Sequence, residues 1–300
     1  MIRSTSILIQ WLAITLVLWI GIARAEAGPG TVLLIHDIQG AGMSSPYLGR
    51  VRTVEGIVVA DFREGLGGFC IQSPYSEADD DPATSEGLFV FSDREPLEVG
   101  DRVRVQGTVV EYYHLTELAD VTELEVLSTG NPLPSPAQVT LPFASSAVPE
   151  RFEGMRVTFP QTLTVTGHRN LRRYGEVVLS AGGRLPRPTA VADPGSSAHQ
   201  VDDDNALRRI ILDDGRTESY PEPIPHGRGG EPLTAKNTLR AGDTVTGLTG
   251  ALLYNFEAYR VHPLAPVDFS PANPRPESPS AAGRLTVAGF NLGNYFTTVD

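Results

Sequence analysis

Short segments of alternating β-branched residues, cut by Gly, Pro and Asp, fill the chain between residues 30 and 270. Alternation with a period of two is typical of half-buried strands, and no convincing amphipathic helix interrupts it. We therefore expect ten strands in two sets of five. The first set is predicted at 51–61, 68–73, 86–92, 101–113 and 121–127, and the second at 155–166, 174–180, 207–212, 243–254 and 266–269.

The two sets share local sequence, which indicates an internal duplication. Gly100-Asp101-x-Val103 opens the long fourth strand of the first set, and Gly242-Asp243-x-Val245 opens its counterpart. Each of these strands also carries a glycine near its middle, Gly107 or Gly250, where we expect a bulge or a sharp bend.

This pattern predicts an all-β fold of two tandem OB-like Greek-key barrels. A half-barrel or a sandwich would give a similar sequence pattern. We expect an N-terminal segment at 26–44, a first module at 45–130, a Pro-rich connector at 131–149, and a second module at 150–269 with a polar insertion at 181–206. A Pro-rich linker at 270–283 then leads to the start of another domain at 284–300.

The N-terminus predicts export. Arg3 precedes an almost wholly apolar run from Ile7 to Ala23, and Ala23-Arg24-Ala25 is a small-x-small cleavage site. We interpret residues 1–25 as a secretory signal peptide, with an uncleaved membrane anchor as the alternative. The expected location is outside the cell, either released or held at the cell surface, with no stable membrane insertion after cleavage.

Net charge and cysteine content limit the kinds of function and of covalent structure that the chain can have. Removal of residues 1–25 leaves 22 basic and 36 acidic residues, a net charge of −14, which argues against a large field that attracts nucleic acid. Cys70 is the only cysteine, so no internal disulfide forms, and its apolar surroundings predict a buried thiol.

Aromatic and basic residues on the expected strands are candidates for contact with nucleic acid. Barrels of the OB type bind single strands with stacking aromatics and a cationic groove. The candidates for stacking and for phosphate contact are Tyr112, Tyr113, Tyr254, Arg102 and Arg104. Core tyrosines and solvent-facing arginines are the simpler interpretation, and OB barrels also bind oligosaccharides or only pack on a neighbour.

Acidic runs suggest a calcium loop. Asp79, Asp80 and Asp81 supply the oxygen ligands that calcium takes, without the spacing of an EF-hand, and a solvated loop is the simpler interpretation. No two of the six histidines are close enough in sequence to form a short metal motif. A zinc site would need ligands gathered from distant parts of the chain.

The last residues carry a resemblance. Val287-Ala288-x-Phe290-Asn291 resembles the opening strand of the DNase-I-like endonuclease/exonuclease/phosphatase superfamily. Further segments, which include Gly68-Phe69-x-Ile71-Gln72 and Arg151-Phe152-Glu153-Gly154-Met155, look like the N-terminal half of large bacterial extracellular nucleases.

The resemblance implies a secreted nuclease that cleaves DNA, with RNA as an alternative substrate, using Mg²⁺, Mn²⁺ or Ca²⁺. Asn291 matches the residue that helps to place the metal and the phosphate, and it is the expected catalytic residue. Because the other catalytic residues of the family would follow later, we expect this chain to be inactive by itself. The alternative is a secreted non-catalytic module that binds polysaccharide or protein, or a spacer.

Overall fold

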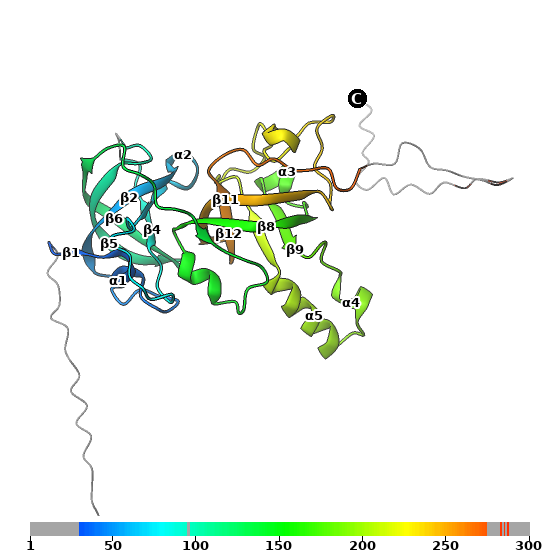
Figure 1. Cartoon of the computed structure of the whole chain (residues 1–300), viewed down its shortest axis with the longest axis horizontal. Helices are drawn as coiled ribbons and strands as arrows, with labels where there is room; N and C mark the ends of the chain where they lie inside the picture. The colour runs from blue at the N-terminus through cyan, green and yellow to red at the C-terminus, as the bar shows by residue number, and fades with distance from the viewer. Residues whose placement is uncertain (1–29, 95–96, 275–282, 284, 286, 288–300) are drawn as a thin grey trace, which may run out of the picture.

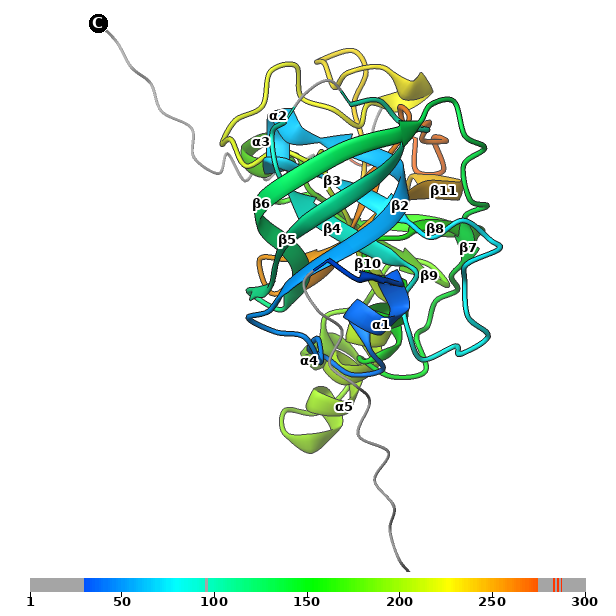
Figure 2. The same cartoon turned by 90° about the vertical axis from the view of Figure 1, so that its left-hand side faces the viewer.

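Each of the two expected modules forms a sheet that closes on itself, and the two sheets lie side by side (Figure 1). The computed structural model describes residues 30–94 and 97–274, together with residues 283, 285 and 287. The expected signal peptide at 1–25, and residues 288–300 with Asn291, lie outside the described residues. The long strands β5 and β6 cross the side of the first barrel that faces away from the second barrel (Figure 2).

The first barrel is built from five strands, in the ring order β2, β3, β4, β6, β5 and back to β2. Its elements are β1 (Val32–Leu33), α1 (Ile35–Gln39), β2 (Val51–Phe62), α2 (Arg63–Leu66), β3 (Gly68–Gln72), β4 (Gly87–Phe91), β5 (Arg102–Tyr112) and β6 (Leu115–Ser128).

The second barrel repeats this ring as β8, β9, β10, β12, β11 and back to β8. Its strands are β7 (Ala137–Gln138), β8 (Arg156–Gly167), β9 (Val177–Ala181), β10 (Arg209–Leu212), β11 (Thr244–Asn255) and β12 (Ala258–Pro263). Its helices are η1 (Val148–Phe152), α3 (Leu171–Tyr174), α4 (Pro188–Val191), α5 (Ser196–Leu207) and η2 (Arg228–Gly230).

Strand connectivity identifies the barrel type. In each ring the first strand pairs with the second and the fourth, and the third strand pairs in parallel with the fifth, as β4 with β6 and β10 with β12. This is the connectivity of a five-stranded Greek-key barrel of the OB type. The predicted all-β fold class is confirmed.

Alternation along the strands explains the two cores. On β5, Val103, Val105 and Val109 are fully buried, while Arg102 and Arg104, which alternate with the first two, are partly exposed. The same period places Phe159 and Leu163 inside the second barrel. Burial of each such side chain stabilises the fold by about 1.5–3 kcal/mol.

The shared Gly-Asp motifs fold into the same corner in both barrels. The φ angles of Gly100 and Gly242 are +97° and +100°, a region that favours glycine. The amide of Gly100 donates to the carbonyl of Val58 at 2.9 Å, and the amide of Gly242 donates to Val165 at 2.8 Å. These matching contacts support the interpretation as a duplication.

The duplication extends into segments that we expected to be connectors. β1 pairs in parallel with β2, and β7 pairs in parallel with β8. Val139, Leu141 and Phe143 lie in the core of the second barrel. The described part of the first segment, residues 30–44, and the segment 131–149 therefore contribute structure to the barrels that follow them.

Several local predictions need correction. A bulge occurs at Gly107, but the irregularity in β11 lies between Thr246 and Leu248 instead of at Gly250. Residues 266–269 are not a strand, and the fifth strand of the second barrel is β12. The polar insertion at 181–206 contains α4 and most of α5, although we expected no helix there.

The two barrels share an apolar seam, which we define as Val59, Ala60, Cys70, Phe89 and Leu115 of the first barrel packed with Ala251 and Leu253 of β11. Polar contacts continue across it. The hydroxyl of Ser85 donates to the carbonyl of Glu153 at 2.7 Å, and the amide of Arg156 donates to Oε1 of Gln72 at 3.0 Å. Among the described residues, no helix is long and apolar enough to cross a membrane.

Candidate functional site

The hairpins that join the last two strands of each barrel have unusual turns, which we call the hairpin tips. The first tip is Tyr113-His114, between β5 and β6, and the second is Phe256-Glu257, between β11 and β12. All four residues have φ between +47° and +75°. Two-residue turns of this kind strongly prefer Asn-Gly, because other residues are strained at positive φ.

Both tips display aromatic side chains. Tyr112, Tyr113 and Phe256 are 61%, 73% and 65% exposed. The tips approach one another, since the ring of His114 lies 5.9 Å from that of Tyr254, edge to face. The half-buried Tyr254 in turn stacks against Tyr259 at 4.9 Å. The predicted residues Tyr112, Tyr113 and Tyr254 therefore lie in one aromatic surface.

Four glutamates gather next to this surface. Glu111 and Glu117 come from β5 and β6, and Glu150 and Glu153 come from η1 and the position after it. The hydroxyl of Tyr259 donates to Oε2 of Glu150. The amide of Thr116 donates to Oε1 of Glu153 at 2.9 Å.

The pKa values of three of these carboxyl groups, those of Glu117, Glu150 and Glu153, are raised. Burial, followed by the neighbouring Glu150, raises the pKa of Glu153 well above its usual range. Burial and the nearby Glu111 raise the pKa of Glu117 to about 7. Oε2 of Glu111 and Oε2 of Glu153 are buried, and neither has a hydrogen-bond partner within the described part of the chain. A protonated carboxyl group can donate a hydrogen bond as well as accept one.

Ion pairs engage the two arginines that we expected to contact phosphate. Arg102 lies 2.9 Å from Glu55 and 2.7 Å from Glu77, and Arg104 lies 2.7 Å from Glu55. Burial raises the pKa of Glu55, but the bonds from Arg104 and Arg102 outweigh it, so its pKa is lowered. Because these arginine charges are already paired with carboxylates, they add little attraction for a phosphate.

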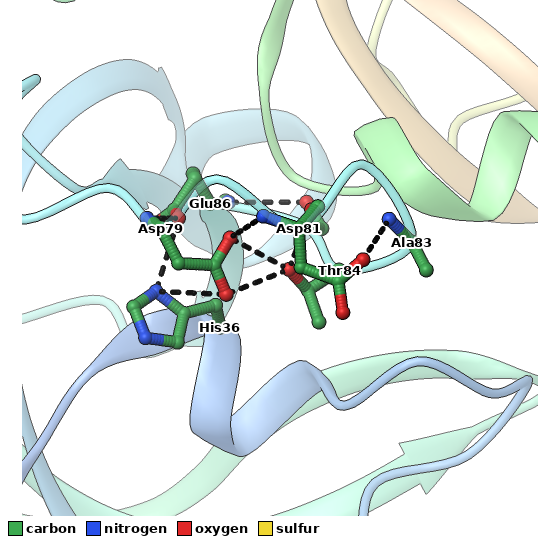
Figure 3. A network of polar contacts seen from close by, with 8 residues as sticks. His36, Asp79, Asp81, Ala83, Thr84 and Glu86 are labelled. Carbon is green, nitrogen blue, oxygen red and sulfur yellow. Dashed lines mark hydrogen bonds and ion pairs between the residues drawn. The ribbon is translucent and has the colours of Figure 1, made fainter.

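A second cluster joins a histidine to two carboxylates, and we call it the His36 cluster (His36, Asp79 and Glu86). Nδ1 of His36 lies 3.0 Å from Oε1 of Glu86 and 3.8 Å from Oδ2 of Asp79 (Figure 3). One ligand atom from each of the three lies within 4.8 Å of the others. His36 comes from α1, and the loop before β4 supplies both carboxylates.

The predicted calcium loop contributes one of its three residues to this cluster. Asp79 faces His36, whereas Asp80 is exposed and Oδ1 of Asp81 accepts the amide of Ala83 at 2.9 Å. His36 and Glu86 were not among the predicted site residues. No local sequence pattern marks them, because only the folding of α1 onto the loop before β4 brings them together.

Burial of the thiol agrees with the sequence. Cys70 is fully buried in the seam. Burial, with a smaller contribution from Glu153, raises the pKa of this thiol, so it is a poor nucleophile.

Comparison with known proteins assigns no activity. Residues 133–271 match the model of a family described as a domain of unknown function, DUF8508. The match covers the second barrel together with β7, and no curated protein matches the chain. The second barrel is therefore similar to a domain whose function is unknown.

Proposed function

We propose that this chain is the accessory, non-catalytic part of an exported metal-dependent nuclease, and that its two hairpin tips contact the nucleic-acid substrate. The observation that carries the proposal is the pair of strained turns that expose Tyr113 and Phe256 at equivalent positions of the two barrels. Strain of about 1–3 kcal/mol for each residue is typically retained where it serves a function.

The hairpin tips occupy a ligand-binding region of the OB fold. The loop between the fourth and fifth strands of these barrels, together with the face of the second and third strands, binds oligonucleotides and oligosaccharides. In the first barrel, Cys70 of β3 and Phe89 of β4 pack into the seam. Because the seam covers part of this strand face, the hairpin tips are the more accessible part of the ligand-binding region.

Stacking suits a substrate of any sequence. Every base has a π-face, and stacking on an aromatic side chain contributes about 1–3 kcal/mol per base. Tyr112, Tyr113 and Phe256 offer exposed rings for this purpose. Because Arg102 and Arg104 are paired, we expect binding with a shallow dependence on salt.

The nuclease assignment rests on the resemblance of the sequence. The divalent metal that it implies is expected beside Asn291, which lies outside the described residues. We expect the purified chain to cleave no DNA. A metal-dependent nuclease activity of this chain would contradict its accessory role.

Reading the gene beyond codon 300 tests the nuclease part of the proposal. We expect a later strand with a metal-binding glutamate, followed by histidine and aspartate motifs. A stop codon, or a domain without these groups, would remove the basis for a nuclease.

Oligosaccharide binding is the second candidate, and the two partly exposed glutamates, Glu111 and Glu150, favour it. Carboxyl groups next to aromatic rings accept hydrogen bonds from sugar hydroxyls, whereas they repel phosphates when they are ionised. OB barrels bind oligosaccharides through the same loops.

Binding measurements separate the two ligand classes. The chain without residues 1–25 is titrated with labelled single-stranded DNA, RNA and a glucan oligosaccharide at about 50 and 200 mM salt. We expect saturable DNA binding that weakens less than about tenfold between these concentrations. Saturable binding of the oligosaccharide alone would favour the second candidate, and binding of neither would indicate a spacer.

A further inference from the structure

We propose that the His36 cluster is a binding site for a divalent transition-metal ion, with Zn²⁺ as the ion to test. The cluster lies in the first barrel, on α1 and the loop before β4. The proposal is independent of the proposed nuclease function and of the hairpin tips.

Distances between the ligand atoms fit such an ion. In a tetrahedral zinc site with bonds of about 2.1 Å, the ligand atoms lie roughly 3.4 Å apart. Nδ1 of His36 lies 3.0 Å from Oε1 of Glu86 and 3.8 Å from Oδ2 of Asp79, on either side of this value. All three ligand atoms lie within 4.8 Å of one another, so side-chain movements of about an ångström would bring them to this spacing.

Ligand chemistry selects the class of metal. An imidazole with two carboxylates suits Zn²⁺ and neighbouring first-row ions, whereas Ca²⁺ takes six to eight oxygen ligands. Asp80 and Asp81 do not join the cluster, so the described residues present too few oxygens for calcium. Asp79 is exposed, which leaves the remaining coordination position to water.

Glu86 supplies an independent indication of a ligand. This residue is only 9% exposed, and its Oε2 is a buried atom that finds no hydrogen-bond partner in the described part of the chain. Its Oε1 already accepts the amide of Asp79 at 2.7 Å. Leaving a buried carboxylate oxygen without a partner destabilises the fold, and a cation bound by the Glu86 carboxylate would remove that penalty.

Surrounding groups hold Asp79 in place. The hydroxyl of Thr84 lies 3.1 Å from both carboxylate oxygens of Asp79, and the amide of Asp81 donates to Oδ1 at 3.0 Å (Figure 3). Hydrogen bonds of this kind orient metal ligands, and their loss typically weakens metal affinity by about 10–100-fold.

A bound ion would link the N-terminal segment that contains α1 to the first barrel. α1 already contacts β4, because Nε2 of Gln39 donates to the carbonyl of Gly87 at 2.7 Å. The ion would add a second link between α1 and the same end of β4. Since the ion binds only the folded arrangement, it stabilises the chain by mass action.

Calorimetric titration of the purified, chelator-treated chain with Zn²⁺ tests the proposal. We expect a single ion to bind per chain, with weaker or no binding of Ca²⁺ and Mg²⁺. We expect Glu86→Gln and His36→Ala each to weaken Zn²⁺ binding at least tenfold, and Thr84→Val to weaken it about tenfold. Replacement of Zn²⁺ by Co²⁺ should give the intense visible absorption of a four-coordinate site.

His199→Ala is the matched control, because His199 is an exposed histidine on α5, far from the cluster in sequence. It should bind Zn²⁺ like the unmodified chain. Zn²⁺ binding that survives both His36→Ala and Glu86→Gln, or that is lost only in His199→Ala, would overturn the proposal, as would no binding at all. If His36→Ala fails to fold, Glu86→Gln and Thr84→Val decide, since each replaces a side chain with one of nearly equal size.

Discussion

Glu117 links the protonation of a single residue to the stability of the first barrel. It lies on β6, is 4% exposed, and pairs with Phe89 of β4 across the parallel strands. Burial and Glu111 raise its pKa from 4.5 to about 7. Because the pKa is higher in the folded state, the neutral carboxyl group stabilises the fold below pH 4.5, and this stabilisation is lost as the pH rises through 7.

We therefore expect Glu117→Gln to reduce the pH dependence of folding. The free energy of unfolding of the unmodified chain should fall by up to about 3 kcal/mol between pH 4.5 and pH 8 on account of this residue. In the variant this contribution should disappear, as measured by urea unfolding at several pH values. Glu123→Gln, at an exposed position on the same strand, is the control, and an equal pH dependence in both variants would contradict the assignment.

Asp101 and Asp243 occupy the same corner in the two barrels and each accept the amide three residues before them, but only Asp243 also pairs with an arginine, Arg228. Asp243 is fully buried, 2.8 Å from Arg228, and it also accepts the amide of Arg240 at 2.8 Å. The carboxylate of Asp101 accepts the amide of Glu98 at 2.9 Å.

We expect Asp243→Asn to lower the free energy of unfolding by about 3 kcal/mol, because it leaves Arg228 without its charged partner. Asp101→Asn should cost about 1 kcal/mol, the value of one weakened hydrogen bond. Denaturant titration measures both values. Equal losses of unfolding free energy in the two variants would show that the ion pair of Asp243 with Arg228 adds no stability to that corner.

At the scale of the elements, the hairpin tips expose aromatic rings on strained turns that lower the stability of the fold. The turn Tyr113-His114 holds two residues at positive φ where Asn-Gly is preferred. We expect Tyr113→Asn with His114→Gly to raise the melting temperature by about 2–4 °C, since relief of strain outweighs loss of the contact between His114 and Tyr254. A fall in melting temperature would mean that the turn is not strained.

The sequence predicts most strands because alternation is a local property. It fails for β12, where the buried Arg260 and His262 interrupt the apolar pattern, and both side chains lie close to Asp213, far away in sequence. Residues 266–269 alternate like a strand, since Val267 and Phe269 are buried, yet they do not join the sheet.

The helix α5 is also not predictable from the sequence, because its residues are mostly polar. Of its residues only Ala198 and Asn205 are buried, so it has no apolar stripe by which a sequence pattern could reveal it. The exposed aromatics of the first tip were predictable, because Tyr112 and Tyr113 follow a clear strand. The His36 cluster was not, because its members come together only through the tertiary fold.

At the scale of the whole molecule, the seam makes the two barrels one folding unit. Leu253 of β11 is fully buried against residues of the first barrel. We expect a single calorimetric unfolding transition for the chain, and we expect Leu253→Ala to lower the free energy of unfolding by about 2–5 kcal/mol. Two separate transitions in the unmodified chain would contradict a shared core.

Packing across the seam also sets the positions of the two tips relative to each other. His114 of the first tip contacts Tyr254, which lies on β11 two residues before the second tip, so a single ligand can touch both barrels. Binding should therefore depend on the two tips together.

The most direct test is a titration of labelled single-stranded DNA with the unmodified chain and with a variant whose two tips, Tyr113-His114 and Phe256-Glu257, are both changed to Asn-Gly. We expect the variant to remain folded and to melt at a higher temperature, yet to bind DNA at least tenfold more weakly, because it loses two stacking rings. Equal affinity of the two proteins, or no DNA binding by the unmodified chain, would contradict the assignment of the hairpin tips as the nucleic-acid site.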